Sequence, residues 1–196
     1  MQATSNNAGL QPARYTAVAI ILHWSIVVAI VAQIGIGWYM GDLGRTPLHA
    51  TVEGIHISLG LTVLLLTVIR LVWRALHPPP ALPTTLPPLE RRAAHLVHVL
   101  FYVLLFALPL SGWVMESFGP RPIPFWGLAW PHFPGLVEVT TRPDARAIKK
   151  TIEEIHGSPM VWSMIGLMVL HVLGALKHQF DGRPVLQRMV PWMRRP

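Results

Sequence analysis

Long apolar stretches alternate with short polar segments along the chain. The first stretch, residues 17–40, contains no charged residue, and the others cover about 54–73, 93–115 and 157–176. A helix needs about 20 residues to cross the roughly 30 Å hydrocarbon core of a bilayer, so each stretch is long enough to span it. The pattern predicts an all-α integral membrane protein, a bundle of four transmembrane helices. A signal peptide is the weaker interpretation of the first stretch, because the run is too long and little positive charge precedes it.

Polar and proline-rich segments complete the organisation. Residues 14–191 are expected to form a single membrane domain between a disordered tail at 1–13 and a C-terminal tail at 192–196. The linker HPPPALPTTLPP at 77–88 is expected to be extended, because proline removes a hydrogen-bond donor and fixes φ. Within the longest connector, 116–156, the segment RPDARAIKKTIEEIH predicts a short amphipathic helix.

Composition supports a membrane location. Of the 196 residues, 52% are hydrophobic and 13% are charged, and the mean hydropathy is +0.45. Soluble domains carry about 25% charged residues, so this chain lacks the polar surface of a water-soluble globule and is too apolar to be disordered. The absence of cysteine excludes disulfides, zinc–thiolate sites, iron–sulfur clusters and haem attached through cysteine.

The basic residues predict the orientation of the bundle. Although the net charge is +7, lysine and arginine beside apolar runs normally set membrane topology, and no nucleic-acid partner is expected. A cytoplasmic N-terminus puts ten of them inside and six outside, so both termini are predicted to be cytoplasmic. The ten are Arg14, Arg70, Arg74, Arg91, Arg92, Lys177, Arg183, Arg188, Arg194 and Arg195, and the six are Arg45, Arg121, Arg142, Arg146, Lys149 and Lys150.

Four histidines lie within or at the ends of the apolar stretches, where ionisable groups are costly and usually functional. By depth, His23 and His171 share the cytoplasmic level, and His56 and His156 share the outer level. At about 1.5 Å per residue the two levels are roughly 22 Å apart. Two imidazoles from facing helices suit the axial positions of a haem iron, so a bis-histidine b-type haem is expected at each level. Hydrogen-bonded core histidines, a hydrated proton path and a transition-metal site are the alternatives.

Other polar groups at the inner level are weaker candidates. Arg70 follows His56 by 14 residues and returns to about the same helix face. A buried arginine needs an anionic partner, and a haem propionate would serve, whereas a snorkelling surface arginine is the alternative. His95 and His98, one turn apart, are possible ligands of an inner haem.

Six segments of the chain carry a recognisable pattern. They are RYTAVAIILHW (14–24), EGIHISLG (53–60), VIRLVWR (68–74), AHLVHVLFYVLLFALPLSGWVM (94–115), PIPFWGLAWP (122–131) and EEIHGSPMVWSMIGLMVLHVLGALKHQF (153–180). Together they resemble the bacterial cytochrome b561 family, which is related to the cytochrome b subunits of nickel–iron hydrogenases and formate dehydrogenase. The resemblance implies two haems b, one held by His23 with His171 and the other by His56 with His156.

One spacing departs from the family pattern. The family commonly places its two fourth-span histidines 14 residues apart, whereas His156 and His171 are 15 apart. In a regular helix, 15 residues at about 100° each leave the two side chains about 60° apart. A bulge or kink in this helix, or a shifted ligand assignment, is therefore expected.

The resemblance also implies an activity. Some family members resemble superoxide:ubiquinone oxidoreductases of the bacterial inner membrane, which use no catalytic side chain beyond the haems. The basic face of Arg146, Lys149 and Lys150 is expected to attract the superoxide anion. Lys177 and His178 are expected to contact ubiquinone near the inner haem.

Several alternatives stay open at this stage. The quinone could instead bind in an outer pocket near Trp126 and Trp130. The chain could be the quinone-coupled anchor subunit of a dehydrogenase or hydrogenase, with a redox protein or a second copy as its partner. An alternative of another class is a haem-free transporter or structural bundle.

Overall fold

The computed structural model describes residues 14–44, 46–81, 86–183 and 185–190. The two predicted tails, 1–13 and 192–196, lie outside the described residues, and so does part of the proline-rich linker, 82–85. Residues 77–81, at the start of that linker, are not helical.

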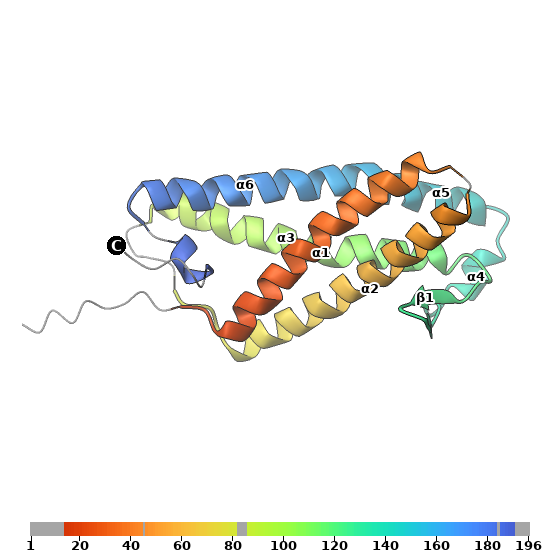
Figure 1. Ribbon diagram of the computed structural model, residues 1–196, viewed down its shortest axis with the longest axis horizontal. Coiled ribbons are helices and arrows are strands. Elements are labelled where there is room, and N and C mark those ends of the chain that lie inside the picture. The colour runs from red at the N-terminus through yellow and green to blue at the C-terminus, as the bar shows by residue number, and fades with distance from the viewer. Residues whose placement is uncertain (1–13, 45, 82–85, 184, 191–196) are drawn as a thin grey trace, which may run out of the picture.

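Four long helical units make up the bundle (Figure 1). They are α1 (Ala17–Asp42), α2 (Pro47–Leu76), α3 (Pro88–Glu116), and a fourth unit made of α5 (Ala145–Ile155), the π-helical turn η1 (His156–Met160) and α6 (Val161–Phe180). All four are long and apolar enough to cross a membrane. Each contains one of the predicted spans, and the predicted four-helix membrane bundle is confirmed.

Threonine caps start the first two helices. Thr16 Oγ1 accepts a hydrogen bond from the Ala19 N–H at 3.2 Å, and Thr46 Oγ1 accepts one from the His49 N–H at the same distance. Such caps satisfy donors that the first helical turn leaves unpaired. Thr16 Oγ1 also accepts from Trp73 Nε1 at 2.9 Å, which ties the beginning of α1 to the end of α2 and holds the two as an antiparallel pair.

The core lies at mid-bundle and the outer surface is apolar. Side chains from all four helical units meet there: Ile26, Ala29, Val63, Leu105 and Met164. In each helix, no more than 28% of the most apolar 18-residue window is buried inside the protein. Helices that are apolar on every side need a non-aqueous surrounding, so the remaining apolar surface faces lipid.

A β-hairpin in the long connector was not predicted. Strands β1 (Ile123–Phe125) and β2 (Leu128–Trp130) pair in antiparallel register across a turn at Trp126 and Gly127, where φ is 49° and 87°. Two positive φ values are typical of the tight turns that join hairpins. The Trp126 N–H donates to Ser58 Oγ at 3.2 Å, so the hairpin is fixed to α2. The helix α4 (Val137–Thr140) and then α5 follow, and α5 is the predicted amphipathic helix.

The two ends of the bundle differ (Figure 1). The hairpin, α4 and α5 lie at one end, which we call the outer end. The start of α1, the end of α2 and the 3₁₀ turn η2 (Leu186–Arg188) lie at the other, which we call the inner end. There, Trp24 Nε1 donates to the Met189 carbonyl at 2.9 Å and Arg188 Nη2 donates to the Ala81 carbonyl at 3.0 Å. The C-terminal segment is therefore packed against the helices.

Candidate functional site

At the inner end, His23 on α1 faces His171 on α6. Their ring centroids lie 6.3 Å apart, and the ring planes are inclined by 67°. The depth argument predicted that these two histidines share a level, and the structure brings them together. Both side chains are half-buried within the bundle.

At the outer end, His56 on α2 faces His156 at the start of η1. Their centroids are also 6.3 Å apart, with the ring planes inclined by 73°. The two pairs therefore have the same separation, although α1 supplies one partner of the inner pair and α2 one partner of the outer pair. The fourth helical unit contributes one histidine to each.

Both separations fit a metal held between two imidazoles. Metal–imidazole bonds of about 2.0 Å, with about 1.1 Å from each nitrogen to its ring centroid, place two axial rings about 6 Å apart. Within the part of the chain that the structure describes, no group of three or more His, Asp or Glu side chains is arranged to hold a metal ion. Two nitrogen ligands on opposite sides of one iron are what a bis-histidine haem requires.

A cavity of about 310 Å³ adjoins the outer pair, and His56 and His156 both line it. Binding pockets for cofactors usually measure about 300–1,000 Å³. Two glycines keep the rings accessible. A Cβ on Gly37 would stand 3.4 Å from His56 Cε1, and one on Gly112 would stand 3.5 Å from His156 Cε1. The residues at the outer pair therefore fit a flat group inserted between the two rings.

The π-helical turn explains the 15-residue spacing. It covers His156–Met160 and includes Pro159. A π-turn contains one residue more than a turn of α-helix. The 15-residue step from His156 to His171 therefore rotates the chain about as far as a 14-residue step does in a regular α-helix. The predicted bulge is confirmed, and the ring of His156 faces His56 despite the added residue.

Residues 14–192 match the model of a protein family described as prokaryotic cytochrome b561. The chain belongs to the prokaryotic cytochrome b561 family. Family membership implies membrane electron transfer and b-type haem.

Three curated relatives match over nearly their whole length. Cytochrome b561 homolog 2 of Escherichia coli (strain K12) is 31% identical over 182 residues, which are 91% of this chain and 92% of that protein. Cytochrome b561 homolog 1 of the same organism is 25% identical over 185 residues, 91% of this chain and 97% of the relative. A Yersinia pestis protein named probable superoxide oxidase CybB is 27% identical over 185 residues, with 91% and 96% covered.

The inner pair of this cytochrome has polar and aromatic neighbours. His98 on α3 has its ring centroid 5.3 Å from that of His171, and its Nδ1 lies 2.6 Å from the Ala94 carbonyl. Phe101 contacts the same His171 ring at 5.5 Å. Arg70 is half-buried, and its Nη1 donates to the Ala19 carbonyl at 3.5 Å. Arg70 is therefore near the inner pair, as its spacing from His56 predicted.

The basic residues Arg146, Lys149 and Lys150 of α5 are not among the residues that line the outer cavity. Lys150 pairs with Glu154 at 3.7 Å on the exposed surface, and Arg146 is exposed as well. Three glutamates line the outer cavity instead: Glu53, Glu116 and Glu153. Sequence reasoning missed this acidic lining, although EGIH at 53–56 and EEIH at 153–156 each place a glutamate three residues before a candidate ligand.

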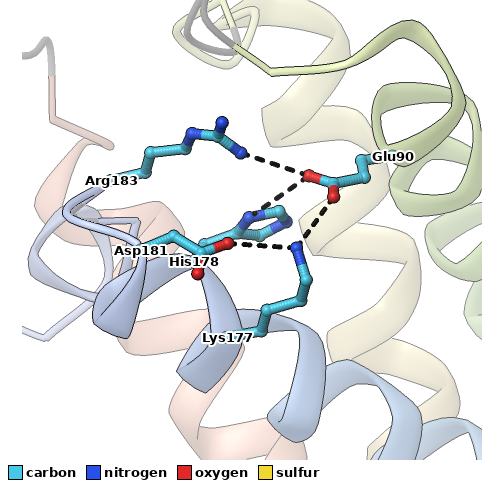
Figure 2. A network of polar contacts seen from close by, with 5 residues as sticks. All are labelled: Glu90, Lys177, His178, Asp181 and Arg183. Atoms are coloured by element: carbon cyan, nitrogen blue, oxygen red, sulfur yellow. Dashed lines mark hydrogen bonds and ion pairs between the residues drawn. The ribbon is translucent and has the colours of Figure 1, made fainter.

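Lys177 and His178 belong to an ion-pair network at the inner end (Figure 2). Lys177 Nζ lies 2.8 Å from Glu90 Oε1 and 3.0 Å from Asp181 Oδ2. His178 Nδ1 and Arg183 Nη1 lie 3.7 Å and 3.4 Å from Glu90 Oε2. The hydrogen bond from Lys177 holds the pKa of the Asp181 carboxyl below its ordinary value of 3.8. Glu90 on α3 therefore joins that helix to the end of α6.

Proposed function

We propose that this cytochrome moves electrons across the inner membrane through two bis-histidine haems b, oxidising superoxide outside and reducing ubiquinone at the cytoplasmic side. The observation that carries the proposal is the pair of equal 6.3 Å separations, one at each end of the bundle. A single pair could serve as an isolated site, whereas two pairs at opposite ends of four membrane helices suit transport of charge between two faces.

The ligands follow from the two pairs. His23 and His171 would hold the inner haem, and His56 and His156 the outer one. Arg70 would neutralise a propionate of the inner haem, since a half-buried guanidinium needs an anionic partner. When bound, each haem supplies an iron that takes up and releases one electron.

The net reaction is balanced in electrons and protons. Two superoxide ions each lose one electron and become dioxygen, and one ubiquinone gains two electrons and two protons to become ubiquinol. Arg146, Lys149 and Lys150 would raise the local concentration of the superoxide anion near the outer end. The Yersinia pestis relative's name supports this choice of substrate.

The quinone site is proposed at the inner end, beside Lys177 and His178. His178 Nδ1 is buried and finds no hydrogen-bond partner among the described residues. Its 3.7 Å separation from Glu90 Oε2 is too long for a hydrogen bond. A buried ring nitrogen without a hydrogen-bond partner can form a hydrogen bond with a quinone oxygen. Lys177 would hold the neighbouring carboxylates in place.

Optical spectra of the purified protein, oxidised and then reduced with dithionite, test the proposal. We expect low-spin b-type bands and two haems per chain. Replacing His171 or His156 with alanine should remove one haem each, while His132→Ala, an exposed loop histidine, should keep both. Colourless wild-type protein from haem-sufficient cells would favour a haem-free transporter or structural bundle.

Turnover tests the substrates separately. We expect superoxide consumption that depends on added ubiquinone and disappears in His156→Ala. Protein with two haems that leaves superoxide untouched but reduces or oxidises quinone with a co-purified partner would instead be the anchor subunit of a dehydrogenase or hydrogenase.

A further inference from the structure

Ser111 on α3 connects His156 to the helix backbone. Its Oγ lies 2.8 Å from the Leu108 carbonyl oxygen and 2.8 Å from His156 Nδ1. The Met160 sulfur, 4.0 Å from the same Oγ, is a much weaker acceptor.

The geometry of these contacts favours one position for the ring hydrogen of His156. A serine hydroxyl has one hydrogen, and a carbonyl oxygen can only accept. With that hydrogen donated to Leu108, the lone pairs of Ser111 Oγ face Nδ1 of His156. Ser111 Oγ, the partner of Nδ1, then acts as an acceptor, which places the ring hydrogen on Nδ1. A neutral imidazole has one N–H, and the lone pair that can bind a metal is left on Nε2.

The two outer histidines are not equivalent. His56 Nδ1 is buried but has no hydrogen-bond partner within the described part of the chain, whereas His156 Nδ1 has Ser111. An acceptor on the N–H of a ligating imidazole fixes its tautomer and raises its basicity. A more basic ligand stabilises the ferric state of the iron relative to the ferrous state.

We propose that Ser111 is a positioning residue for His156, which keeps hydrogen on Nδ1, directs Nε2 at the outer haem iron and lowers that haem's midpoint potential. This inference rests on the proposed bis-histidine ligation. The hydroxyl acts only through His156, so the inner haem is outside its influence. Polar second partners of this kind typically change metal affinity by about 10–100-fold.

The test is a spectroelectrochemical titration of the holoprotein and two variants. Ser111→Ala should raise the midpoint potential of one haem by about 59 mV, which is a tenfold shift of the equilibrium of a one-electron couple toward the reduced state. The midpoint potential of the other haem should not change. The Ser111→Ala protein should also release the outer haem faster. Ser111→Thr retains a hydroxyl and should show the wild-type midpoint potential and the wild-type rate of haem release. Ser163→Ala, at an exposed position of α6, controls for loss of a hydroxyl elsewhere.

Two results would overturn the inference. One is a Ser111→Ala protein with two haems whose potentials and haem retention equal those of wild type. The other is an equal shift in Ser111→Thr, because the hydroxyl would then not be the cause. Wild-type protein without haem would overturn the proposed function as well, and this outcome is recognised before any serine variant is made.

Discussion

The imidazoles of His56 and His156 lie 6.3 Å apart between ring centroids, the same separation that joins His23 to His171 at the opposite end of the bundle. α1 supplies one histidine, α2 supplies another, and the fourth helical unit supplies one to each pair. The register of that unit therefore controls both pairs at once. Three other properties can each be altered alone. They are the space beside the histidine rings, the charge at the outer end of the bundle and the ion pairs at the inner end.

Space beside His56 is tested at Gly37. A Cβ at this position would stand 3.4 Å from His56 Cε1, so the branches of a valine would extend into the volume between the rings. We expect Gly37→Val to lower haem content from two to one per chain, measured by pyridine haemochrome. Gly35→Val is the matched control on the same helix, because a Cβ there meets nothing within 4 Å. Equal haem loss in both variants would show that helix damage, not the ring contact, is responsible.

Because of the π-turn, the effect of deleting one residue from the fourth helical unit on haem binding should depend on where the residue is removed. Removing Pro159 from η1 takes out the extra residue and leaves a regular helix, so His156 and His171 should stay aligned and two haems should bind. Removing Val169 from the regular part of α6 rotates the preceding segment by about 100° relative to His171. We expect that variant to retain at most one haem in reduced-minus-oxidised spectra. Loss of haem from the Pro159 deletion would contradict the assigned role of the bulge.

Charge at the outer end should appear in the salt dependence of superoxide consumption. Neutralising Arg146, Lys149 and Lys150 to glutamine should slow the reaction at low ionic strength. The difference should shrink near 0.1 M salt, where the Debye length is about 10 Å. The control replaces Arg146 with lysine and both Lys149 and Lys150 with arginine. This variant keeps the charge and should preserve the rate of superoxide consumption. Stopped-flow rates that do not respond to the neutralised variant at low salt would remove the steering role.

The glutamates that line the outer cavity predict the opposite effect on superoxide consumption. Glu53 lines the outer cavity, so its charge repels superoxide close to the site. Glu53→Gln is expected to speed superoxide consumption at low salt without changing haem content. Glu154→Gln, at an exposed position of α5, is the comparison variant, and its rate should change less than that of Glu53→Gln.

The inner network predicts a stabilisation that is present at neutral pH and is lost in acid. The pKa of Asp181 is lowered in the folded state by the hydrogen bond from Lys177, so its contribution is present above the ordinary value of 3.8 and is lost as pH falls through the lower, folded value. Asp181→Asn should therefore melt below wild type at neutral pH, and the two melting temperatures should converge below pH 3.8. A constant difference across that range would contradict the pairing.

The sequence by itself determined the membrane class and the four spans, because each span is a predominantly apolar stretch of about 20 residues, long enough to cross a bilayer. Depth along those spans was enough to match His23 with His171 and His56 with His156. The 15-residue spacing was sufficient to predict either a bulge or kink in this helix or a shifted ligand assignment, since helical phase is a local property.

Only the tertiary structure decided which groups meet across helices. The hydrogen bond between His156 and Ser111, the glycine beside His56 and the glutamates that line the outer cavity bring together segments that are far apart along the chain. The hairpin at Ile123–Trp130 likewise depends on its contact with Ser58 on α2. Such contacts depend on helix rotation and crossing, which packing sets through side-chain shape, and periodicity along one helix carries no information about either.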